Sequence, residues 1–219
     1  MRFNVFLSGS VVYIARCFKI SFLDKPDQLL LSHQYRNKLK ITKHWLDCAE
    51  RTISPNYDDR PDEAEISLIV IHCISLPPGE YGARYIHQLF CNQLNPEDHE
   101  YFKEIHELKV SAHFLIDRNG DITQFVPINK RAWHAGRSEY NGRKRCNDFS
   151  VGIELEGTET QSFTRVQYTK LALLIRSLLD RYPQLSKNHI TGHNQIAPGR
   201  KLDPGDAFEW KILMKLLEE

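Results

Sequence analysis

Eight consecutive residues, 67–74 (S-L-I-V-I-H-C-I), constrain the fold more than any other segment of this 219-residue chain. They are apolar and rich in β-branched side chains, which is typical of a buried strand. The Pro77-Pro78-Gly79 sequence that follows cannot continue a strand and predicts a loop. The chain therefore has to build a sheet that buries this strand.

The remaining patterns alternate between strands and helices. Asn119-Gly120 lies between two apolar runs, which predicts a β-hairpin. Thr164 is a suitable N-cap and Pro183 a suitable stop for a helix with apolar residues at helical spacing. In order, the expected elements are a hairpin of residues 111–117 and 122–126, a strand at 149–156, a helix at 164–182, a short strand at 189–193 and a helix at 208–217. This interleaving predicts a single α/β domain from about residue 44 to the end.

Charge is divided unevenly along the chain. The formal net charge is +1, from 29 basic and 28 acidic residues. Residues 1–43 contain eight basic and two acidic residues, whereas residues 44–219 contain 21 and 26. The near-neutral total lacks the basic excess of nucleic-acid binders, so no nucleic-acid partner is expected. We interpret residues 1–43 as a basic, irregular N-terminal extension of an acidic domain.

The N-terminus and the cysteines bear on the cellular compartment. Arg2 followed by an apolar stretch at residues 3–15 resembles the start of a secretory signal. No A-x-A cleavage pattern follows, and the stretch is shorter than the roughly 20 residues of a membrane span. The five cysteines are widely spaced and form no C-x-x-C pair, which favours a reducing compartment. We expect a cytoplasmic protein without a membrane partner; a periplasmic protein with residues 1–20 as a signal is the alternative.

Three residues at the ends of apolar segments are candidate metal ligands. His72 lies in the first strand, His193 closes the segment I-T-G-H, and Asp203 stands in the turn-rich sequence K-L-D-P-G. Two imidazoles and one carboxylate form a catalytic zinc set, because three protein ligands leave a fourth tetrahedral position for water. Zinc lowers the pKa of that water and polarises a carbonyl, which suits amide hydrolysis. Spacing alone does not select these residues among ten histidines, so a hydrogen-bonded strand histidine remains the competing interpretation of His72.

Several longer blocks of sequence resemble one enzyme family. They stand in order from about residue 44 to the C-terminus and comprise residues 54–61, 70–79, 110–114, 130–136, 145–157 and 191–201. These blocks resemble the zinc-dependent N-acetylmuramoyl-L-alanine amidases, and among them the cytoplasmic amidases of bacterial cell-wall recycling that act on 1,6-anhydro-N-acetylmuramyl-L-alanine. The resemblance implies one α/β zinc amidase domain, residues 44–219, with a central mixed β-sheet flanked by helices.

The resemblance also implies roles for individual residues. His72, His193 and Asp203 match the zinc ligands. Glu154 matches the general base, and Lys201 matches the cation that stabilises the oxyanion of the tetrahedral intermediate. Glu156 is the alternative candidate for the general base. Glu154 and Glu156 lie on the same face of a strand, so strand periodicity does not distinguish them. The family pattern favours Glu154 and leaves Glu156 as a supporting or solvated residue; Lys201 on its own would be interpreted as a solvated surface charge.

Substrate contacts are implied at four further positions. Trp133 offers a flat apolar face to a sugar or peptide, and Arg145 can bind carboxylates bidentately. Lys109 stands where relatives often have arginine, so a bidentate contact would be lost there. His134 either lines the substrate pocket or satisfies a buried hydrogen bond, and we include it among the candidate contacts. Relatives often have Asn where this chain has Cys73, and a thiol poorly replaces an amide with two donors.

The sequence thus predicts a monomeric zinc hydrolase with an anhydromuropeptide substrate. It would cleave the amide between the lactyl group of (1,6-anhydro-)N-acetylmuramic acid and L-alanine, in muropeptide recycling and in control of β-lactamase induction. Two alternatives stay open: an exported amidase that trims mature peptidoglycan, and a non-catalytic peptidoglycan-recognition module. Removal of residues 1–20 in the periplasm would favour the first, and purified protein with no bound zinc and no amidase activity after zinc is added would favour the second.

Overall fold

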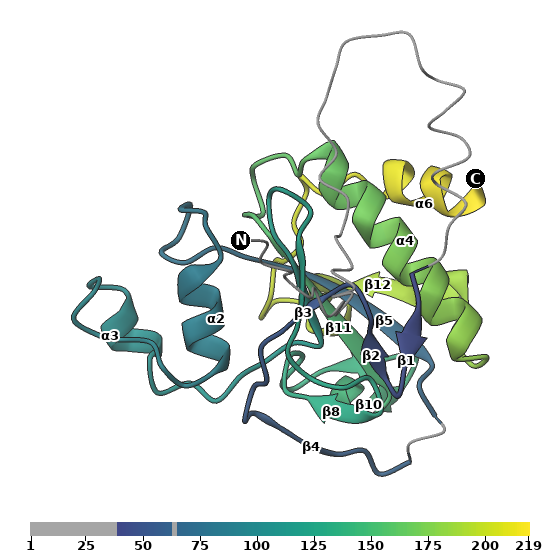
Figure 1. Ribbon diagram of the computed structural model, residues 1–219, viewed down its shortest axis with the longest axis horizontal. Helices are drawn as coiled ribbons and strands as arrows, with labels where there is room; N and C mark the ends of the chain where they lie inside the picture. The colour runs from purple at the N-terminus through teal and green to yellow at the C-terminus, as the bar shows by residue number, and fades with distance from the viewer. Residues whose placement is uncertain (1–38, 63–64) are drawn as a thin grey trace, which may run out of the picture.

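A six-stranded mixed sheet forms the centre of the molecule (Figure 1). The computed structural model describes residues 39–62 and 65–219, so the expectations for residues 1–38 lie outside the described residues. In spatial order the strands are β12 (Ile190–Gly192), β5 (Leu68–Ile74), β11 (Ser150–Glu156), β6 (Phe114–Ile116), β7 (Ile122–Gln124) and β3 (Glu50–Arg51). β6 and β7 pair antiparallel, as the Asn119-Gly120 hairpin signal predicts, and the other neighbours pair in parallel. The predicted mixed sheet is confirmed.

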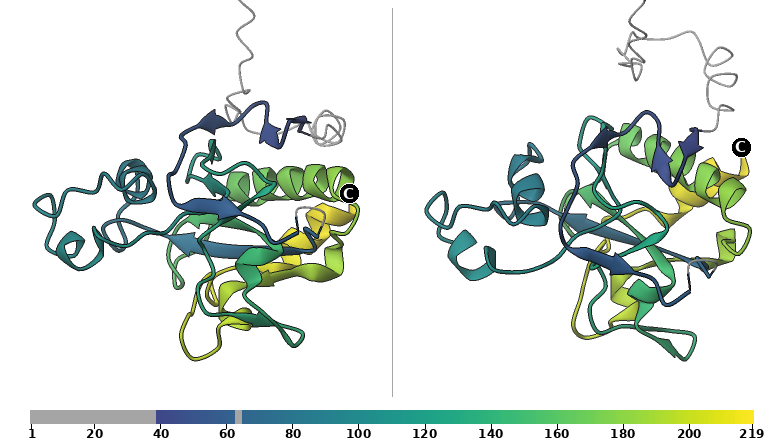
Figure 2. Two further views of the ribbon diagram at one scale, coloured as in Figure 1. Left: turned by 90° about the horizontal axis from the view of Figure 1, so that it is seen from below. Right: turned by 60° about the horizontal axis from the view of Figure 1, so that its bottom comes forward.

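β5 is the buried strand that the apolar run predicts, and both of its faces are covered. Ile69 and Ile71 belong to the main core, which α4 (Arg165–Arg181) and α6 (Trp210–Glu218) complete from one side (Figure 2). Leu68 and Val70 belong to a smaller core on the other side, together with Ala135, Cys146, Phe149 and Ile196. Coverage of both faces explains why the run has no polar alternation.

α4 begins and ends close to where the sequence places it. The Thr164 side chain accepts a hydrogen bond from the backbone N–H of Gln167, and the Gln167 side chain accepts one from the backbone N–H of Thr164. This reciprocal capping box satisfies two N–H groups that a helix leaves without partners. The Gln167 amide also donates to the carbonyl groups of Ile116 and Glu156, so the cap ties α4 to two strands.

The residues just before position 44 form part of a β-hairpin that contacts the domain. β1 (Ile41–Thr42) and β2 (Trp45–Leu46) form a tight hairpin whose turn residues, Lys43 and His44, both have positive φ. Leu39 and Ile41 pack against the main core, and the backbone N–H of Leu39 donates to the Ser177 hydroxyl of α4 over 2.8 Å. Residues 39–43 therefore pack against the domain.

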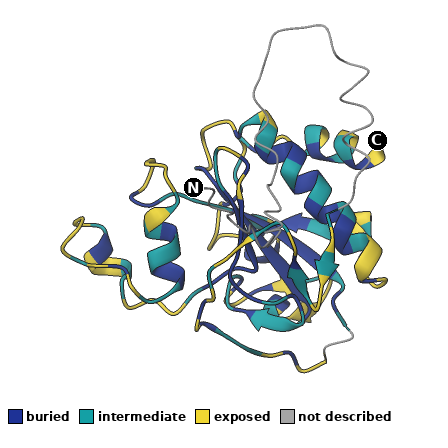
Figure 3. Ribbon diagram, viewed as in Figure 1, coloured by how far each residue is buried: buried dark blue, intermediate teal, exposed yellow. Residues whose placement is uncertain are grey.

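Two short helices, α2 (Arg84–Phe90) and α3 (Phe102–Ile105), form a lobe beside the sheet that the sequence did not predict (Figure 1). The lobe packs against the sheet through a second apolar core, to which the lobe contributes Ile86, Phe90 and Phe102 and the sheet contributes Leu115 of β6; buried residues are most concentrated in the central sheet (Figure 3). The other short elements are β4 (Tyr57–Asp59), β8 (Lys130–Ala132), β9 (Glu139–Tyr140), β10 (Arg143–Lys144), η1 (Cys146–Asp148), η2 (Lys187–His189) and α5 (His193–Ile196). None of the helices in the described ranges combines the length and apolarity that a bilayer crossing requires.

Replacing Thr164 by Ala should lower the free energy of unfolding by about 1 kcal/mol, because it removes the capping hydroxyl of α4. Urea unfolding followed by circular dichroism measures this change. Thr160→Ala is the matched control, since Thr160 is exposed and lies just before the helix. Equal effects at the two positions would show that the capping box does not stabilise α4.

Candidate metal and catalytic site

The candidate ligands meet at the carboxyl ends of three neighbouring parallel strands. In the β5–β11 ladder Glu154 lies opposite His72, and in the β5–β12 ladder Gly192 lies opposite Ile71. His193 follows Gly192 directly and begins α5, so it also reaches the level of His72. Open α/β sheets commonly bind ligands at this edge, because loops diverge there and leave a crevice.

Asp203 completes the cluster from a loop that is anchored to α5. One carboxylate oxygen, Oδ2, lies 2.9 Å from Nδ1 of His72 and 3.0 Å from Nδ1 of His193. The three potential ligand atoms lie within 4.8 Å of one another, and all three residues are buried. The backbone N–H of Asn194 donates to the Asp203 carbonyl over 2.8 Å, which links the loop to the start of the helix. The structure therefore brings together the three residues that the sequence singled out as ligands.

Hydrogen bonding at His193 shows that this cluster suits a cation. Nε2 of His193 lies 3.1 Å from the carbonyl oxygen of Ala135, which can only accept, so this contact favours the tautomer with the ring proton on Nε2. In that tautomer the Nδ1 lone pair faces the Asp203 carboxylate, and a cation between the two atoms would relieve their repulsion. Two imidazole nitrogens and one carboxylate oxygen are ligands that a divalent metal accepts.

Burial and mutual contacts shift the ionisation of the cluster. Burial lowers the pKa of His72 to about 4, against the opposing effect of its close contact with the Asp203 carboxylate. Burial by itself would raise the pKa of Asp203, but its close contacts with His193 and His72 outweigh burial and hold that pKa below its usual value. A neutral imidazole and an ionised carboxylate are the forms that bind metal.

Glu154 presents an unpaired carboxyl oxygen beside the cluster. Its side chain is 8% exposed, and its Oε2 is buried without a hydrogen-bond partner. Burial and the charge of Asp203 raise the pKa of Glu154 well above its usual value, while the charge of Lys201 acts in the opposite direction. A carboxyl group with a free oxygen and a raised pKa is chemically suited to accept a proton near neutral pH.

Glu156 has a different environment on the same face of β11. Its Oε1 accepts hydrogen bonds from the backbone N–H groups of Gly82 and Ala83, both at 2.6 Å, and its Oε2 accepts one from the backbone N–H of Arg118 at 3.1 Å. The residue is 2% exposed, so it is not solvated. Glu156 anchors the start of α2 to the sheet, a contact that strand periodicity cannot reveal.

An open cavity of about 490 Å³ joins the cluster to the α2–α3 lobe. His72, His193, Asp203, Glu154 and Lys201 line one end. Apolar side chains from the lobe and the segment after it line the other, namely Leu89, Phe90, Tyr101, Ile105, Leu108 and Val110. The cavity therefore combines an ionisable end with an apolar wall that sequence patterns missed.

Of the four predicted substrate contacts, Trp133 and His134 line this cavity. Arg145 does not; its side chain is 71% exposed, with Nε 3.2 Å from the Asp148 carboxylate. Lys109 is exposed and lies between two residues of the apolar wall, Leu108 and Val110, without itself lining the cavity. Cys73 lines the cavity, and burial raises the pKa of its thiol, so the sulfur stays protonated.

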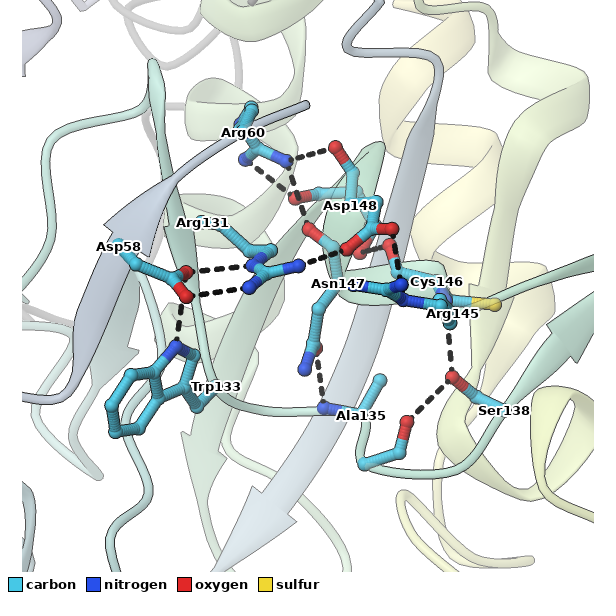
Figure 4. Close-up of polar contacts among 12 residues, drawn as sticks. Asp58, Arg60, Arg131, Trp133, Ala135, Ser138, Arg145, Cys146, Asn147 and Asp148 are labelled. Atoms are coloured by element: carbon cyan, nitrogen blue, oxygen red, sulfur yellow. Dashed lines mark hydrogen bonds and ion pairs between the residues drawn. The ribbon is translucent and has the colours of Figure 1, made fainter. Parts of the chain in front are cut away.

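A network of ion pairs holds Trp133 in place (Figure 4). The indole N–H donates to Asp58 over 3.1 Å, and Arg131 binds the same carboxylate through Nε at 2.6 Å and Nη2 at 2.5 Å. Nη1 of Arg131 also binds Asp148 at 2.5 Å. The hydrogen bond from Arg131 holds the pKa of Asp58 below its usual value. No local sequence pattern indicates this network, because it depends on the pairing of β4 with β8.

Comparison with known proteins identifies the family. The family model for N-acetylmuramoyl-L-alanine amidase matches residues 62–206. A curated relative from Escherichia coli (strain K12), the 1,6-anhydro-N-acetylmuramyl-L-alanine amidase AmpD, is 57% identical over 170 residues, which are 78% of this chain and 92% of that protein. The chain belongs to the N-acetylmuramoyl-L-alanine amidase family.

Solved structures of amidases share this fold. A crystal structure of a selenomethionine derivative of AmpD matches with a TM-score of 0.80 and 52% identity, over 82% of this chain and 99% of that one. The Escherichia coli amidase AmiD, in complex with the substrate anhydro-N-acetylmuramic acid-L-Ala-D-γ-Glu-L-Lys, matches with a TM-score of 0.51 and 30% identity, over 69% of this chain and 57% of that one. The predicted family, enzyme class and amidase fold are confirmed.

The two carboxylates of this amidase should have opposite effects on stability. Glu156→Gln should destabilise the metal-free protein by about 1–3 kcal/mol, because an amide nitrogen cannot accept the N–H bonds that it would face. Glu154→Gln should stabilise it, because a buried carboxyl without a partner is replaced by a neutral group. Urea unfolding in the presence of a chelator measures both changes.

The gain from Glu154→Gln should grow with pH. Because the pKa of Glu154 is raised in the folded state, the folded protein keeps a proton that the unfolded chain releases above about pH 4.3. The unmodified protein therefore loses stability as the pH rises, and the variant does not share this loss. A gain that is the same at about pH 4 and about pH 7 would contradict the raised pKa.

Proposed function

We propose that this chain is a zinc hydrolase that cleaves the amide between the lactyl group of (1,6-anhydro-)N-acetylmuramic acid and L-alanine in muropeptides, during cell-wall recycling. The observation that carries the proposal is the convergence of His72, His193 and Asp203 beside the unpaired oxygen of Glu154. The names of the AmpD relatives, and the anhydromuropeptide bound by AmiD, support this choice of substrate.

The metal in this proposal is zinc, held by Nδ1 of His72, Nδ1 of His193 and a carboxylate oxygen of Asp203. These three ligands are of the types that catalytic zinc sites use, and they leave one coordination position open. Bound zinc would supply Lewis-acid polarisation of the scissile carbonyl and of water. The lone pair of His193 aimed at a carboxylate supports a cation at this position.

The protein's own groups then move the protons and stabilise charge. Glu154 accepts a proton from the attacking water through its free oxygen and delivers it to the leaving nitrogen of L-alanine. Lys201, which lines the same end of the cavity, stabilises negative charge on the former carbonyl oxygen. The effect of the Lys201 charge on Glu154 and on His72 supports its closeness to both.

Substrate contacts are proposed around the cavity. Trp133 offers an apolar ring face, since its N–H is already committed to Asp58. Lys109 and Arg145 do not line the cavity. Their positive charges would bind the carboxylates of a stem peptide that extends out of it. Arg145 has a left-handed backbone, with φ of 63°, which is an uncommon conformation that supports a functional constraint on this loop.

We further propose that the enzyme is a cytoplasmic monomer composed of the amidase domain, residues 44–219, and a basic N-terminal extension, residues 1–43, of which residues 39–43 pack against the domain. Within the described ranges, Cys73, Cys91 and Cys146 are free thiols, which supports a reducing compartment.

Removal of zinc or of Glu154 should abolish hydrolysis. Purified protein is incubated with anhydromuropeptide, and products are identified by mass spectrometry. A chelator should stop release of the peptide and added zinc should restore it; Glu154→Gln should lower kcat by about 10²–10⁴-fold while zinc binding persists. Glu97→Gln, an exposed glutamate between α2 and α3, is the control.

Other outcomes of this assay exclude the proposal. Wild-type protein that binds zinc and leaves the amide intact would point to a recognition module. Cleavage of intact sacculi in preference to anhydromuropeptide would point to an exported amidase. Full activity of Glu154→Gln, with loss in Glu156→Gln, would reverse the assignment of the base.

Trp133→Ala should raise KM about tenfold with little change in kcat, because it removes an apolar surface that binds ground state and transition state alike. Trp133→Phe retains a ring face and should be affected less. Trp45→Ala, a tryptophan of the N-terminal hairpin, is the matched control. A fall in kcat at unchanged KM would contradict a binding role for Trp133.

A further inference from the structure

Both ring nitrogens of His134 are engaged within the protein. Nδ1 lies 2.9 Å from Nε2 of His72, and Nε2 lies 3.1 Å from the hydroxyl oxygen of Ser150. A histidine with both nitrogens in internal hydrogen bonds has none left to offer a substrate. The function of His134 therefore has to be sought in what these two bonds do.

Four residues are linked by hydrogen bonds in the order Cys146, Ser150, His134 and His72, and the Cys146 carbonyl at one end sets the direction of the bonds. The hydroxyl of Ser150 donates to the carbonyl oxygen of Cys146 over 2.6 Å, since a carbonyl only accepts. Ser150 has a single proton, so its oxygen accepts the Nε2–H of His134. Nδ1 of His134 is then an acceptor and takes the Nε2–H of His72. This leaves Nδ1 of His72 with a lone pair, 2.9 Å from the Asp203 carboxylate.

The neighbouring residue orients the second histidine in the same way. The carbonyl of Ala135, which also accepts from Arg200 over 2.7 Å, favours the tautomer of His193 with the proton on Nε2, and this tautomer leaves Nδ1 with a lone pair 3.0 Å from the same carboxylate oxygen. Two consecutive residues thus select the same tautomer in both imidazoles, with the proton on Nε2 and the lone pair on Nδ1.

We propose that the segment His134–Ala135 is a positioning element for the metal, and that His134 fixes the tautomer of His72 rather than contacting substrate. The inference rests on the proposed zinc site but not on the reaction carried out there. A partner that holds the proton of a ligand histidine removes the competing tautomer, in which Nδ1 carries hydrogen and cannot bind metal.

The surroundings of this segment hold it rigidly. The side-chain oxygen of Asn147 accepts a hydrogen bond from the backbone N–H of Ala135 at 2.8 Å (Figure 4). It accepts a second from the backbone N–H of His134 at 3.3 Å. Gly152 makes room for the imidazole on the sheet: a Cβ at this position would lie 2.4 Å from a ring carbon of His134. The ring therefore lies on β11 between Ser150 and the level of Glu154, and has little freedom to turn.

Zinc affinity of the intact protein tests the proposal, measured by competition with a chromophoric chelator. His134→Phe keeps a ring but offers no acceptor, so affinity should fall about 10–100-fold. His134→Asn places an amide oxygen near the position of Nδ1 and should retain most of the affinity. Ser150→Ala, which releases the Nε2 proton of His134, should give an intermediate loss.

His87→Phe is the matched control, because His87 is a partly buried histidine of α2 whose ring packs edge-on against Phe125, away from the metal ligands. Its zinc affinity should equal that of the wild type. Circular dichroism checks the fold of each variant; if His134→Phe does not fold, the ranking of wild type, His134→Asn and Ser150→Ala decides the question.

Wild-type zinc affinity in folded His134→Phe, or in Ser150→Ala if His134→Phe does not fold, would overturn the proposal. So would equal losses in His134→Asn and His134→Phe, since these would show that the acceptor does not matter. Failure of the proposed function has a separate signature, which is wild-type protein that binds zinc but leaves anhydromuropeptide intact.

Discussion

The parallel pairing of β5 with β11 is the constraint on which the site depends. Seven residue pairs run from Leu68–Ser150 to Ile74–Glu156, and this register sets His72 directly beside Glu154. A shift of one residue would turn either side chain to the opposite face, into the core beneath α4 and α6. The burial of Ile69, Ile71 and Val151 in that core therefore fixes the relation between a candidate metal ligand and the candidate base.

Two arginines beside this sheet connect the segments that surround the site. The buried guanidinium of Arg60 donates to the carbonyl oxygens of Ile128, Asn147, Asp148 and Ser150, so one side chain joins the segment before β8 to the turn before β11. Arg131 joins Asp58 of β4 to Asp148 of η1 in the same region (Figure 4). These contacts position the segment that carries Trp133, His134 and Ala135 beside the sheet.

The main elements could be predicted from sequence because each has a local cause. The apolar run of β5, the Asn119-Gly120 turn and the cap at Thr164 act within a few residues. The α2–α3 lobe lacks such signals: α2 has seven residues and begins after Ala83 without a side-chain cap. Two- and three-residue strands such as β4 and β8 exist only through their partners.

The site residues also differ in how far the sequence could predict them. Its ligands were selected by family resemblance, since nothing local distinguishes His72 among ten histidines. The choice between Glu154 and Glu156 needed three-dimensional contacts, because the N–H groups that occupy Glu156 come from residues 82, 83 and 118. The proton positions at His72 and His193 likewise depend on groups distant in sequence.

The division of the cavity between the α2–α3 lobe and the sheet has an evolutionary consequence. The lobe contributes much of the apolar wall of the cavity, while the candidate metal ligands and Glu154 come from the sheet and the loop beyond it. Mutations in the lobe can therefore remodel which sugar or peptide is accommodated without disturbing the ligands. Substrate range and catalytic rate can therefore change independently in such a protein. The exception is the pair of hydrogen bonds between Glu156 and the start of α2, because a change there affects both the lobe and the strand that carries Glu154.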